Sequence, residues 1–305
     1  MRLGLDIGGT KIDAVALGDG DAVLARVRIP TGFGGEAVLR NAEAAVIQVA
    51  DAAGGGLSAL ESVGIGIPGM VDAAAGVVRN AVNLGLDELA LGPELAARVG
   101  APVFVENDVN AASLGAYHLL GLGRSAAYLN LGTGLAAGFV LDGELWRGAR
   151  GTAGEIGHIP VEPDGEICAC GQRGCLETVA SGGWVARKWG SSAALPVLEL
   201  FDRADDGDPR AVALRDQLVS GAAAAVRVLV LTVDVETVVI GGGLSSLGAR
   251  LIDRIAVALD EQALASQFLA SLRLSSRIRL VPQGEPVAAI GAALVGAPAS
   301  DSITA

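Results

Sequence analysis

The stretch LDIGGTK, residues 5–11, places a carboxylate, two glycines, a hydroxyl and a lysine within one short segment. Apolar runs on either side, RLGLDI and IDAVAL, predict two strands, so the glycines fall in the turn of a β-hairpin. Glycines let backbone N–H groups converge on an anion where a Cβ would block the approach. The turn is therefore either an ordinary tight hairpin or one that binds a phosphate group.

This turn offers each kind of group that a nucleotide phosphate needs. Gly8 and Gly9 expose backbone N–H groups, and Thr10 adds a hydroxyl donor. Lys11 adds a positive charge, and Asp6 can hold a hydrated Mg²⁺. We therefore predict a nucleotide-phosphate site here.

Two further glycine-rich turns support this prediction. Gly132, Thr133 and Gly134 join two predicted strands, and Gly242 and Gly243 close a third, TVVIGGG. Neither the GxxxxGKS/T fingerprint nor a GxGxxG between a strand and a helix occurs. The three turns thus indicate a nucleotide site that differs from both of these phosphate-binding loops.

Turns and apolar runs predict the element order β-β-β-α-β-α twice. The first copy has three strands in its first thirty residues, a helix near 35–53, a strand at 62–68 and a helix at about 108–120. The second opens with the strands SAAYLNLG and LAAGFVLDG and closes with a helix at 244–264, the strand RIRLVPQ and a terminal helix near 286–297. We expect two α/β domains that share a cleft and a crossing helix, because no low-complexity linker separates them.

The composition limits the partners. The chain is 51% hydrophobic and 3% aromatic, so its core is built from Ala, Val, Leu and Ile. The net charge of −12 opposes nucleic-acid binding, although backbone N–H groups can still bind a phosphate locally. The start of the chain has no signal-peptide pattern, and charged residues interrupt the apolar stretch at 221–240. We expect a cytoplasmic protein with no nucleic-acid or membrane partner.

All three cysteines, Cys168, Cys170 and Cys175, lie within eight positions. An odd number in one loop cannot form a fully paired disulfide framework, which indicates a reducing compartment. Together with His158 they make a Cys₃His set, which suits tetrahedral Zn²⁺; a chance cluster of buried thiols is the alternative. Four protein ligands leave no open position, so the predicted zinc is structural.

VENDVNAA, residues 105–112, sets Asn107 and Asp108 where a predicted strand meets a predicted helix. Polar side chains at this position commonly cap helices. A carboxylate there can also accept a proton from an attacking hydroxyl. The residues alone leave both interpretations open.

These motifs, in this order, resemble the ROK family of sugar kinases, within the actin-like ATPase superfamily. The resemblance covers nearly the whole chain, and the spacing CxCGxxGCxE after GEIGH is its most specific part. The motifs that carry it are DIGGTK, GIGIPGMVD, VENDVNAA, LGTG, GEIGH, CACGQRGCLE and IGGGL.

The resemblance implies a sugar kinase that uses ATP with Mg²⁺ bound across the three glycine turns. Asp108 would be the catalytic base that takes the proton from the 6-hydroxyl of a hexose, and Asn107 would fix a neighbouring hydroxyl. His158 would both bind the structural Zn²⁺ and touch the sugar. The other implied sugar contacts are Gly69, Asn83, Glu155 and Glu177.

The implied fold is the two-domain actin-like ATPase (ribonuclease-H-like) fold with a cleft between the domains. Residues 1–118, joined by a C-terminal helix at 286–305, would form one domain, and residues 119–285, with the zinc loop at 158–175, the other. By resemblance we expect a homodimer or a homotetramer.

Glucose is the expected substrate, because VENDVNAA with the full zinc loop is similar to the zinc-containing bacterial glucokinases of this family. N-acetylglucosamine, N-acetylmannosamine, mannose and fructose remain alternatives. Met70 stands where some relatives carry a polar residue, which argues against N-acetylmannosamine. Ala136 and Ala137 replace glycines that are frequent in relatives, but the preceding turn is intact. A sugar-responsive repressor, for which we expect a preceding DNA-binding domain, and a non-catalytic sugar-binding protein are the less favoured classes.

Overall fold

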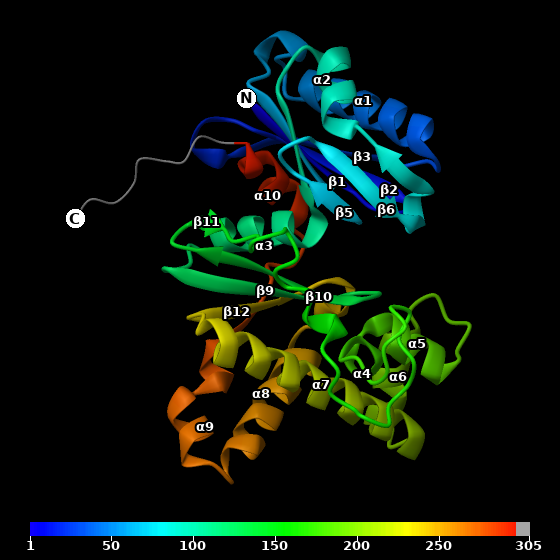
Figure 1. Cartoon of the computed structure of the whole chain (residues 1–305), viewed down its shortest axis with the longest axis vertical. Helices are drawn as coiled ribbons and strands as arrows, with labels where there is room; N and C mark the ends of the chain where they lie inside the picture. Colours follow the sequence, from blue (N-terminus) through cyan, green and yellow to red (C-terminus); the bar gives the residue numbers. More distant parts are fainter. Residues whose placement is uncertain (297–305) are drawn as a thin grey trace, which may run out of the picture. The chain divides into compact units, whose positions relative to one another are not determined.

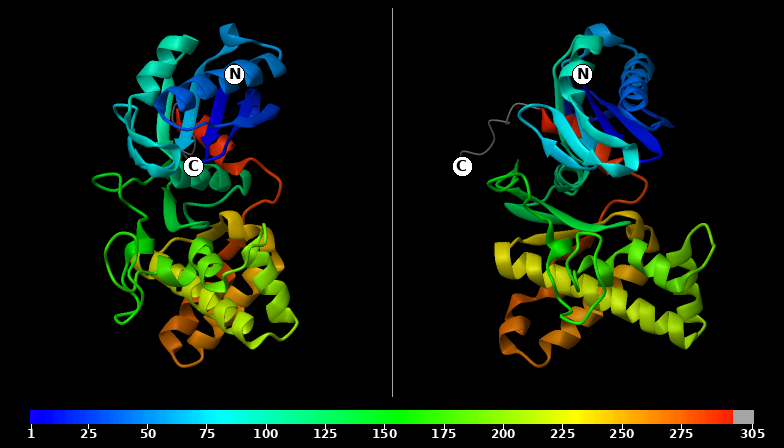
Figure 2. Two further views of the ribbon diagram at one scale, coloured as in Figure 1. Left: turned by 90° about the vertical axis from the view of Figure 1, so that its right-hand side faces the viewer. Right: turned by 45° about the vertical axis from the view of Figure 1, so that its right-hand side comes forward.

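The computed structural model describes residues 1–296, which form two compact α/β units (Figures 1 and 2). The first unit consists of residues 1–121, 147–151 and 284–296, and the second of residues 122–146 and 152–283. Each unit has its own hydrophobic core.

The first unit is built on a five-stranded sheet in the order β3-β2-β1-β4-β8. β1, β2 and β3 form an antiparallel meander, whereas β1, β4 and β8 run parallel. Parallel strands that are covered on both faces have continuous apolar sequences, and β4, SVGIGI, is buried at every position. The strands are β1 Arg2–Ile7, β2 Lys11–Leu17, β3 Val23–Pro30, β4 Ser62–Ile67 and β8 Val103–Asn107.

Helices cover both faces of this sheet (Figure 2). Leu3 and Leu5 of β1 point into the core that α1 and α2 close. Alternate residues of a strand face opposite sides, so Gly4 points toward α10 on the other face, where α10 packs against α3. The helices are α1 Gly35–Ala52, α2 Leu91–Val99, α3 Asp108–Leu119 and α10 Val287–Val295.

The helix α10 packs at backbone distance because glycines leave room for it. A Cβ on Gly64 of β4 would lie 1.7 Å from the carbonyl oxygen of Ala292. A Cβ on Gly115 of α3 would lie 2.0 Å from that of Val287. This packing joins the C-terminal helix to the first unit; residues 297–305 of the predicted helix lie outside the described residues.

A small antiparallel sheet, β5-β6-β7, completes the first unit. Its strands are β5 Met70–Asp72, β6 Val77–Ala81 and β7 Leu86–Leu89. Short 3-10 helices connect elements in both units: η1 Asp19–Asp21, η2 Leu57–Ala59, η3 Val82–Leu84, η4 Ile156–His158, η5 Gly243–Leu247 and η6 Leu274–Arg277.

The sheet of the second unit repeats the plan of the first. Its order is β11-β10-β9-β12-β13, with an antiparallel meander of β9, β10 and β11 and parallel pairing of β9, β12 and β13. The predicted α/β fold with two related units is thereby confirmed. The strands are β9 Ser125–Leu131, β10 Leu135–Leu141, β11 Glu144–Leu145, β12 Thr237–Gly241 and β13 Ile278–Leu280.

The helices of the second unit differ from the prediction at two places: α9 was not predicted, and one predicted helix is interrupted. The predicted helix at 244–264 is wrong as a single element, because Gly248 has φ +60° and ψ −133°, which no α-helix accommodates. The 3-10 segment η5 precedes this glycine, and α8 follows it. The helices are α4 Glu177–Ala180, α5 Gly182–Trp189, α6 Pro196–Asp205, α7 Pro209–Val233, α8 Ala249–Ala263 and α9 Gln267–Leu272.

The helix α7 is the one described helix that is long and apolar enough to cross a membrane by length and composition. Half of its most apolar window is buried inside the protein, where it packs against α4, α6 and α8. A helix that is apolar on most sides is expected in a protein core as well as in a membrane. Its composition is thus explained by its packing.

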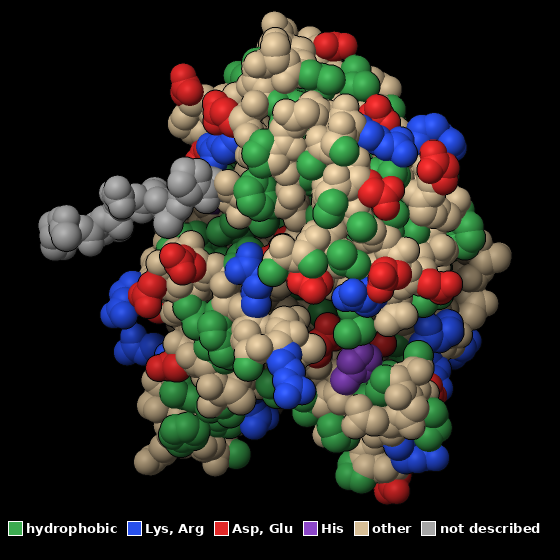
Figure 3. Space-filling view, turned by 45° about the horizontal axis from the view of Figure 1, so that its top comes forward, with side chains coloured by type: hydrophobic (Ala, Val, Ile, Leu, Met, Phe, Trp, Pro, Cys, Tyr) green, Lys and Arg blue, Asp and Glu red, His purple; other side chains and the backbone are tan. Residues whose placement is uncertain are grey.

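Acidic and basic side chains are interspersed on the surface. On the face drawn in Figure 3, red acidic groups lie among the blue basic ones. With a net charge of −12, this surface offers little of the positive field that attracts nucleic acids.

Candidate active site

In the first unit, two hydrogen bonds from Thr31 hold the glycine turn between β1 and β2. This threonine is fully buried; its hydroxyl donates to the carbonyl of Gly8 at 2.6 Å and its N–H to that of Thr10 at 3.2 Å. Gly9, Thr10 and Lys11 are exposed. The turn is therefore anchored through its carbonyl groups, while residues 9–11 remain exposed to solvent.

Asn83 lies next to this turn. A Cβ on Gly9 would come within 3.6 Å of the Asn83 Cβ and of its carbonyl oxygen. Sequence reasoning grouped Asn83 with the sugar contacts; the structure places it beside the predicted phosphate turn.

Asp6 and Asp108 lie on either side of a glycine at the carboxyl end of the sheet. Asp6 pairs in register with Gly66 of β4, and a Cβ on Gly66 would lie 3.5 Å from the Asp108 Cα. Burial raises the pKa of Asp6 to about 7, and the charges of Asp108 and Asp13 add to this effect. The positive charge of Lys11 acts in the opposite direction.

Asn107 is the N-cap of α3. Its side-chain oxygen accepts from the N–H groups of Val109 at 2.9 Å and Asn110 at 3.3 Å. Its amide nitrogen donates to the carbonyl of Gly69 at 3.4 Å. The capping interpretation therefore holds for Asn107, and Asp108 is the first residue of the helix that Asn107 caps.

Gly69 requires its glycine. Its φ of +107° is disfavoured for other residues, and a Cβ would lie 2.8 Å from the carbonyl oxygen of Arg79. The following residue, Met70, is exposed, and its sulfur lies 3.6 Å from the amide nitrogen of Asn80.

In the second unit, the turn Gly132-Thr133-Gly134 is held by the start of α5. Gly182 N–H donates to the Gly132 carbonyl at 2.8 Å, and Gly183 N–H to the Thr133 carbonyl at 3.2 Å. A Cβ on Gly183 would lie 2.5 Å from the Thr133 oxygen, so this contact needs a glycine.

The third glycine turn lies beside the second. A Cβ on Gly242, which has φ +77°, would lie 2.5 Å from the side-chain oxygen of Asn130 and 2.6 Å from the carbonyl carbon of Leu131. The Gly242 N–H donates to the Tyr128 hydroxyl at 3.1 Å. Apart from its chain neighbours and the backbone of its own 3-10 segment, no described heavy atom lies within 4 Å of the Cβ position of Gly243, so this side of the turn is open.

Glu177, the first residue of α4, lies beside both the second turn and the histidine segment. Its carboxylate accepts from the Leu135 N–H at 3.0 Å, and a Cβ on Gly134 would lie 2.7 Å from the same oxygen. A Cβ on Gly157 would lie 3.5 Å from the Glu177 Cβ. One carboxylate thus lies at the junction of two predicted site segments.

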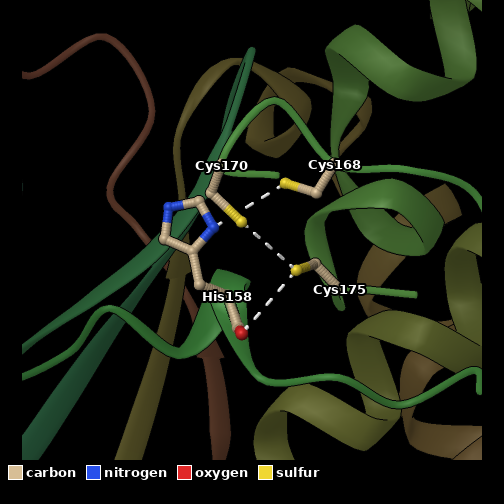
Figure 4. A group of neighbouring side chains, drawn as sticks. All are labelled: His158, Cys168, Cys170 and Cys175. Atoms are coloured by element: carbon tan, nitrogen blue, oxygen red, sulfur yellow. Dashed lines mark hydrogen bonds between the residues drawn. The ribbon is translucent and has the colours of Figure 1, made fainter. Parts of the chain in front are cut away.

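The three cysteines and His158 converge on one point (Figure 4). Their ligand atoms all lie within 4.8 Å of one another. The Nδ1 atom of the imidazole lies 3.8 Å from the Cys168 Sγ, and the sulfurs of Cys170 and Cys175 are 3.6 Å apart. The Nε2 atom lies 3.9 Å from a carboxylate oxygen of Glu155. One ring nitrogen therefore faces the thiols and the other faces an acid.

The thiols of this cluster differ in acidity. A hydrogen bond from the backbone N–H of Gln172 is the largest of the effects that lower the pKa of Cys170 to about 6. Burial raises the pKa of Cys175 to about 12. Three sulfurs and an imidazole nitrogen at these distances are a donor set that fits a tetrahedral metal.

Protein contacts also hold the cysteine loop in place. Leu176 N–H donates to the carbonyl of Ile159 at 2.9 Å. The Glu166 carboxylate accepts from the Trp184 Nε1 at 3.1 Å and pairs with Lys188, both on α5. The loop is therefore tied to the same helix that holds the second glycine turn.

Three residues that support these segments were not predicted. Thr31 and Tyr128 each anchor one glycine turn, and Glu106 is a buried acid directly before Asn107. The only signal for Glu106 is an acidic residue in the apolar run PVFVE, since a buried charge requires a partner. Thr31 and Tyr128 carry no local pattern that marks them.

Two α/β units with duplicated sheets, each presenting glycine turns at its strand ends, define the actin-like ATPase class of fold. The ROK family profile matches residues 2–296, and the chain belongs to the ROK family. The chain is 36% identical over 268 residues to a glucokinase of Thermotoga maritima, covering 81% of this chain and 83% of that one.

Solved structures agree with this family. A ROK hexokinase from Thermus thermophilus matches with a TM-score of 0.81 and 33% identity, covering 96% of this chain and 97% of that one. A ROK family glucokinase from Streptomyces griseus, in complex with glucose and AMPPNP, matches with a TM-score of 0.79 and 31% identity, covering the same shares of the two chains.

Proposed function

We propose that this protein is a glucokinase, which transfers the γ-phosphoryl group of ATP to the 6-hydroxyl of glucose. The observation that carries the proposal is its similarity, over more than four fifths of the chain, to a relative named glucokinase.

MgATP is assigned to the three glycine turns. Gly8, Gly9 and Thr10 offer backbone and hydroxyl donors, and Lys11 a positive charge. Asp6 would hold the hydrated Mg²⁺, which neutralises phosphate charge. The two turns of the second unit, 132–134 and 242–243, would contribute further backbone donors.

The sugar is assigned to Asn107, Gly69 and Asp108 of the first unit and to Glu155, His158 and Glu177 of the second. The Asp108 carboxylate would take the proton of the 6-hydroxyl as that oxygen forms its bond to the γ-phosphorus. The bond to the β-phosphate oxygen breaks, and ADP leaves with that oxygen. Carboxylates such as Glu155 and Glu177 suit the vicinal hydroxyls of a hexose because each can accept two hydrogen bonds.

Zn²⁺ fits the cluster of His158 Nδ1 and the sulfurs of Cys168, Cys170 and Cys175. When bound, the metal would join the three sulfurs and the imidazole through four coordination bonds and so hold the loop. His158 would then be held in one tautomer and orientation, with Nε2 free to face the sugar.

We further propose a cytoplasmic homodimer or homotetramer without nucleic-acid or membrane partners. Exposed apolar side chains occur on α7, α8 and α9 and in the turn between α8 and α9: Leu231, Val257, Leu264 and Phe268. A second copy of the chain could cover them. Light scattering of Phe268→Ser would show a monomer if this surface forms the dimer; an unchanged mass would argue against it.

A coupled ADP-release assay over a panel of hexoses tests the catalytic proposal. We expect glucose to give the highest kcat/KM, ahead of N-acetylglucosamine, N-acetylmannosamine, mannose and fructose. Asp108→Asn should lower kcat by at least about 100-fold, because general base catalysis contributes ~10²–10⁴-fold. Wild-type protein that no sugar stimulates would refute the kinase, and an active Asp108→Asn variant would refute the base.

A further inference from the structure

We propose that Glu106 and Arg147 form a positioning pair for Asp108, an assignment that rests on the proposed kinase function. Glu106 is the last-but-one residue of β8, and only 2% of its surface is exposed. Arg147 lies in the segment 147–151, which belongs to the first unit although second-unit residues flank it on both sides.

The carboxylate of Glu106 accepts hydrogen bonds from three groups, which belong to two segments of the chain. Its Oε1 accepts from the backbone N–H of Asn107 at 3.0 Å and from the side-chain amide of Asn110 at 2.8 Å. Its Oε2 accepts from Nε of Arg147 at 2.6 Å. Both oxygens of this buried acid are therefore used.

The two contacts to Oε1 bracket the proposed base. Asn107 immediately precedes Asp108, and Asn110 lies two positions after it, in the first turn of α3. One oxygen atom thus fixes the chain on both sides of Asp108. Because Asn107 also caps α3, the strand end and the first helical turn form one rigid junction.

Arg147 is the cationic partner of this buried carboxylate. Removal of one partner from a buried ion pair leaves an uncompensated charge, which draws in water or a proton. Arg147 would therefore act on the reaction through Glu106, without touching the substrate.

Arg147 begins the segment that connects β11 to the proposed sugar residues. The chain runs from β11 through residues 147–151 and reaches Glu155 a few positions later. The side chain of Arg147 is 39% exposed, so its pairing is not enforced by burial alone. The ion pair to Glu106 fixes the start of the segment that leads to the proposed sugar residues Glu155 and His158.

The test compares Glu106→Gln and Arg147→Ala with wild type. In Glu106→Gln the new side-chain NH₂ group would face either the Asn110 amide or the Arg147 guanidinium. Both are hydrogen-bond donors, so one of the two present hydrogen bonds would be lost. We expect each variant to lose ~10–100-fold in kcat with a smaller change in the KM for ATP, since misplacement by about 1 Å costs ~10²-fold. Glu106→Gln combined with Arg147→Ala should lose no more than the worse single variant.

Two readouts separate positioning from mere stability. Guanidinium chloride, well below denaturing concentrations, should restore part of the kcat of Arg147→Ala, and Arg147→Lys should retain more activity than Arg147→Ala. Arg98→Ala is the matched control, because Arg98 is 33% exposed and pairs with Glu43 at 3.0 Å in the same unit. It should keep wild-type kcat.

Amide hydrogen exchange over residues 103–112 provides a measure that does not depend on turnover. Faster exchange in both Glu106→Gln and Arg147→Ala, but not in Arg98→Ala, would support the pair. If exchange and kcat stay within twofold of wild type, or if Arg98→Ala loses as much activity, the pair has no positioning role. A wild-type protein without hexose-dependent turnover refutes the proposed function instead, and the exchange result still decides whether the pair holds this junction.

Discussion

Replacing Gly64 by alanine tests the backbone-distance packing of α10. The new Cβ would lie 1.7 Å from the carbonyl oxygen of Ala292, whereas a carbon needs roughly 3.2 Å. Neither atom belongs to a flexible side chain, so the helix must withdraw by about 1.5 Å. A gap of that size removes much of the dispersion contact that Ala289, Ile290 and Ala293 make with the sheet.

We expect Gly64→Ala to destabilise the first unit by about 3 kcal/mol, the upper part of the range for overpacking. For a unit of this size that corresponds to a Tm lower by about 6–12 °C. The helix α3 should shift as well, because it contacts α10 through Gly115. Since α3 begins at Asp108, kcat should fall along with stability.

The assay follows urea unfolding by two signals. Trp146, Trp184 and Trp189 all lie in the second unit, so tryptophan emission reports that unit, whereas far-UV circular dichroism reports both. Gly35→Ala is the control: Gly35 is the first residue of α1, and its Cβ position is 3.7 Å from the nearest side-chain atom. This variant should be neutral or slightly stabilising. If the free energies of unfolding of the two variants differ by less than about 0.5 kcal/mol, the precision of such comparisons, the close packing of α10 does not exist in solution.

Two further predictions concern charge and metal. In Mg²⁺-free buffer the raised pKa of Asp6 means that its carboxyl is protonated in the folded state below pH about 7 but ionised in the unfolded state above about 4. Its burial therefore costs stability progressively as pH rises through this window. Asp6→Asn should stabilise the protein at pH 8 and change little at pH 4; equal effects at both pH values would contradict the raised pKa. Purified protein should contain one metal ion per chain, and Cys175→Ser should lose the ion and at least about 3 kcal/mol of second-unit stability, seen in tryptophan emission. A metal-free wild type with an unchanged Tm would remove the structural zinc from the proposal.

Local patterns predicted most elements of the fold. The strand ends and the glycine turns follow from apolar runs broken by Gly-Gly or Gly-Thr-Gly, because strand propensity and backbone freedom at these positions depend on the nearest residues. The predicted helix at 244–264 failed for the same kind of reason. Its apolar spacing continues through Gly248, but the backbone there has a conformation that ends any helix.

Parts of the candidate site could be predicted because their residues are close in sequence. Cys168, Cys170 and Cys175 share one short loop, and their chemistry indicates a metal whatever the rest of the chain does. The roles of Asp108 and the proposed sugar residues stay predictions. Contacts between distant residues could not be predicted in this way. The sequence around Asn83 gives no sign that this residue lies against Gly9.

By itself the sequence determined that this chain folds as two related α/β units with three glycine-rich turns and a thiol–imidazole cluster. The tertiary structure alone decided which distant segments support one another: Thr31 under Gly8, Tyr128 under Gly242, and Arg147 paired with Glu106. The physical reason is the separation along the chain over which each interaction acts. Turn and strand preferences act between neighbours along the chain, whereas a buried polar group finds its partner only after the sheet has formed and water has left.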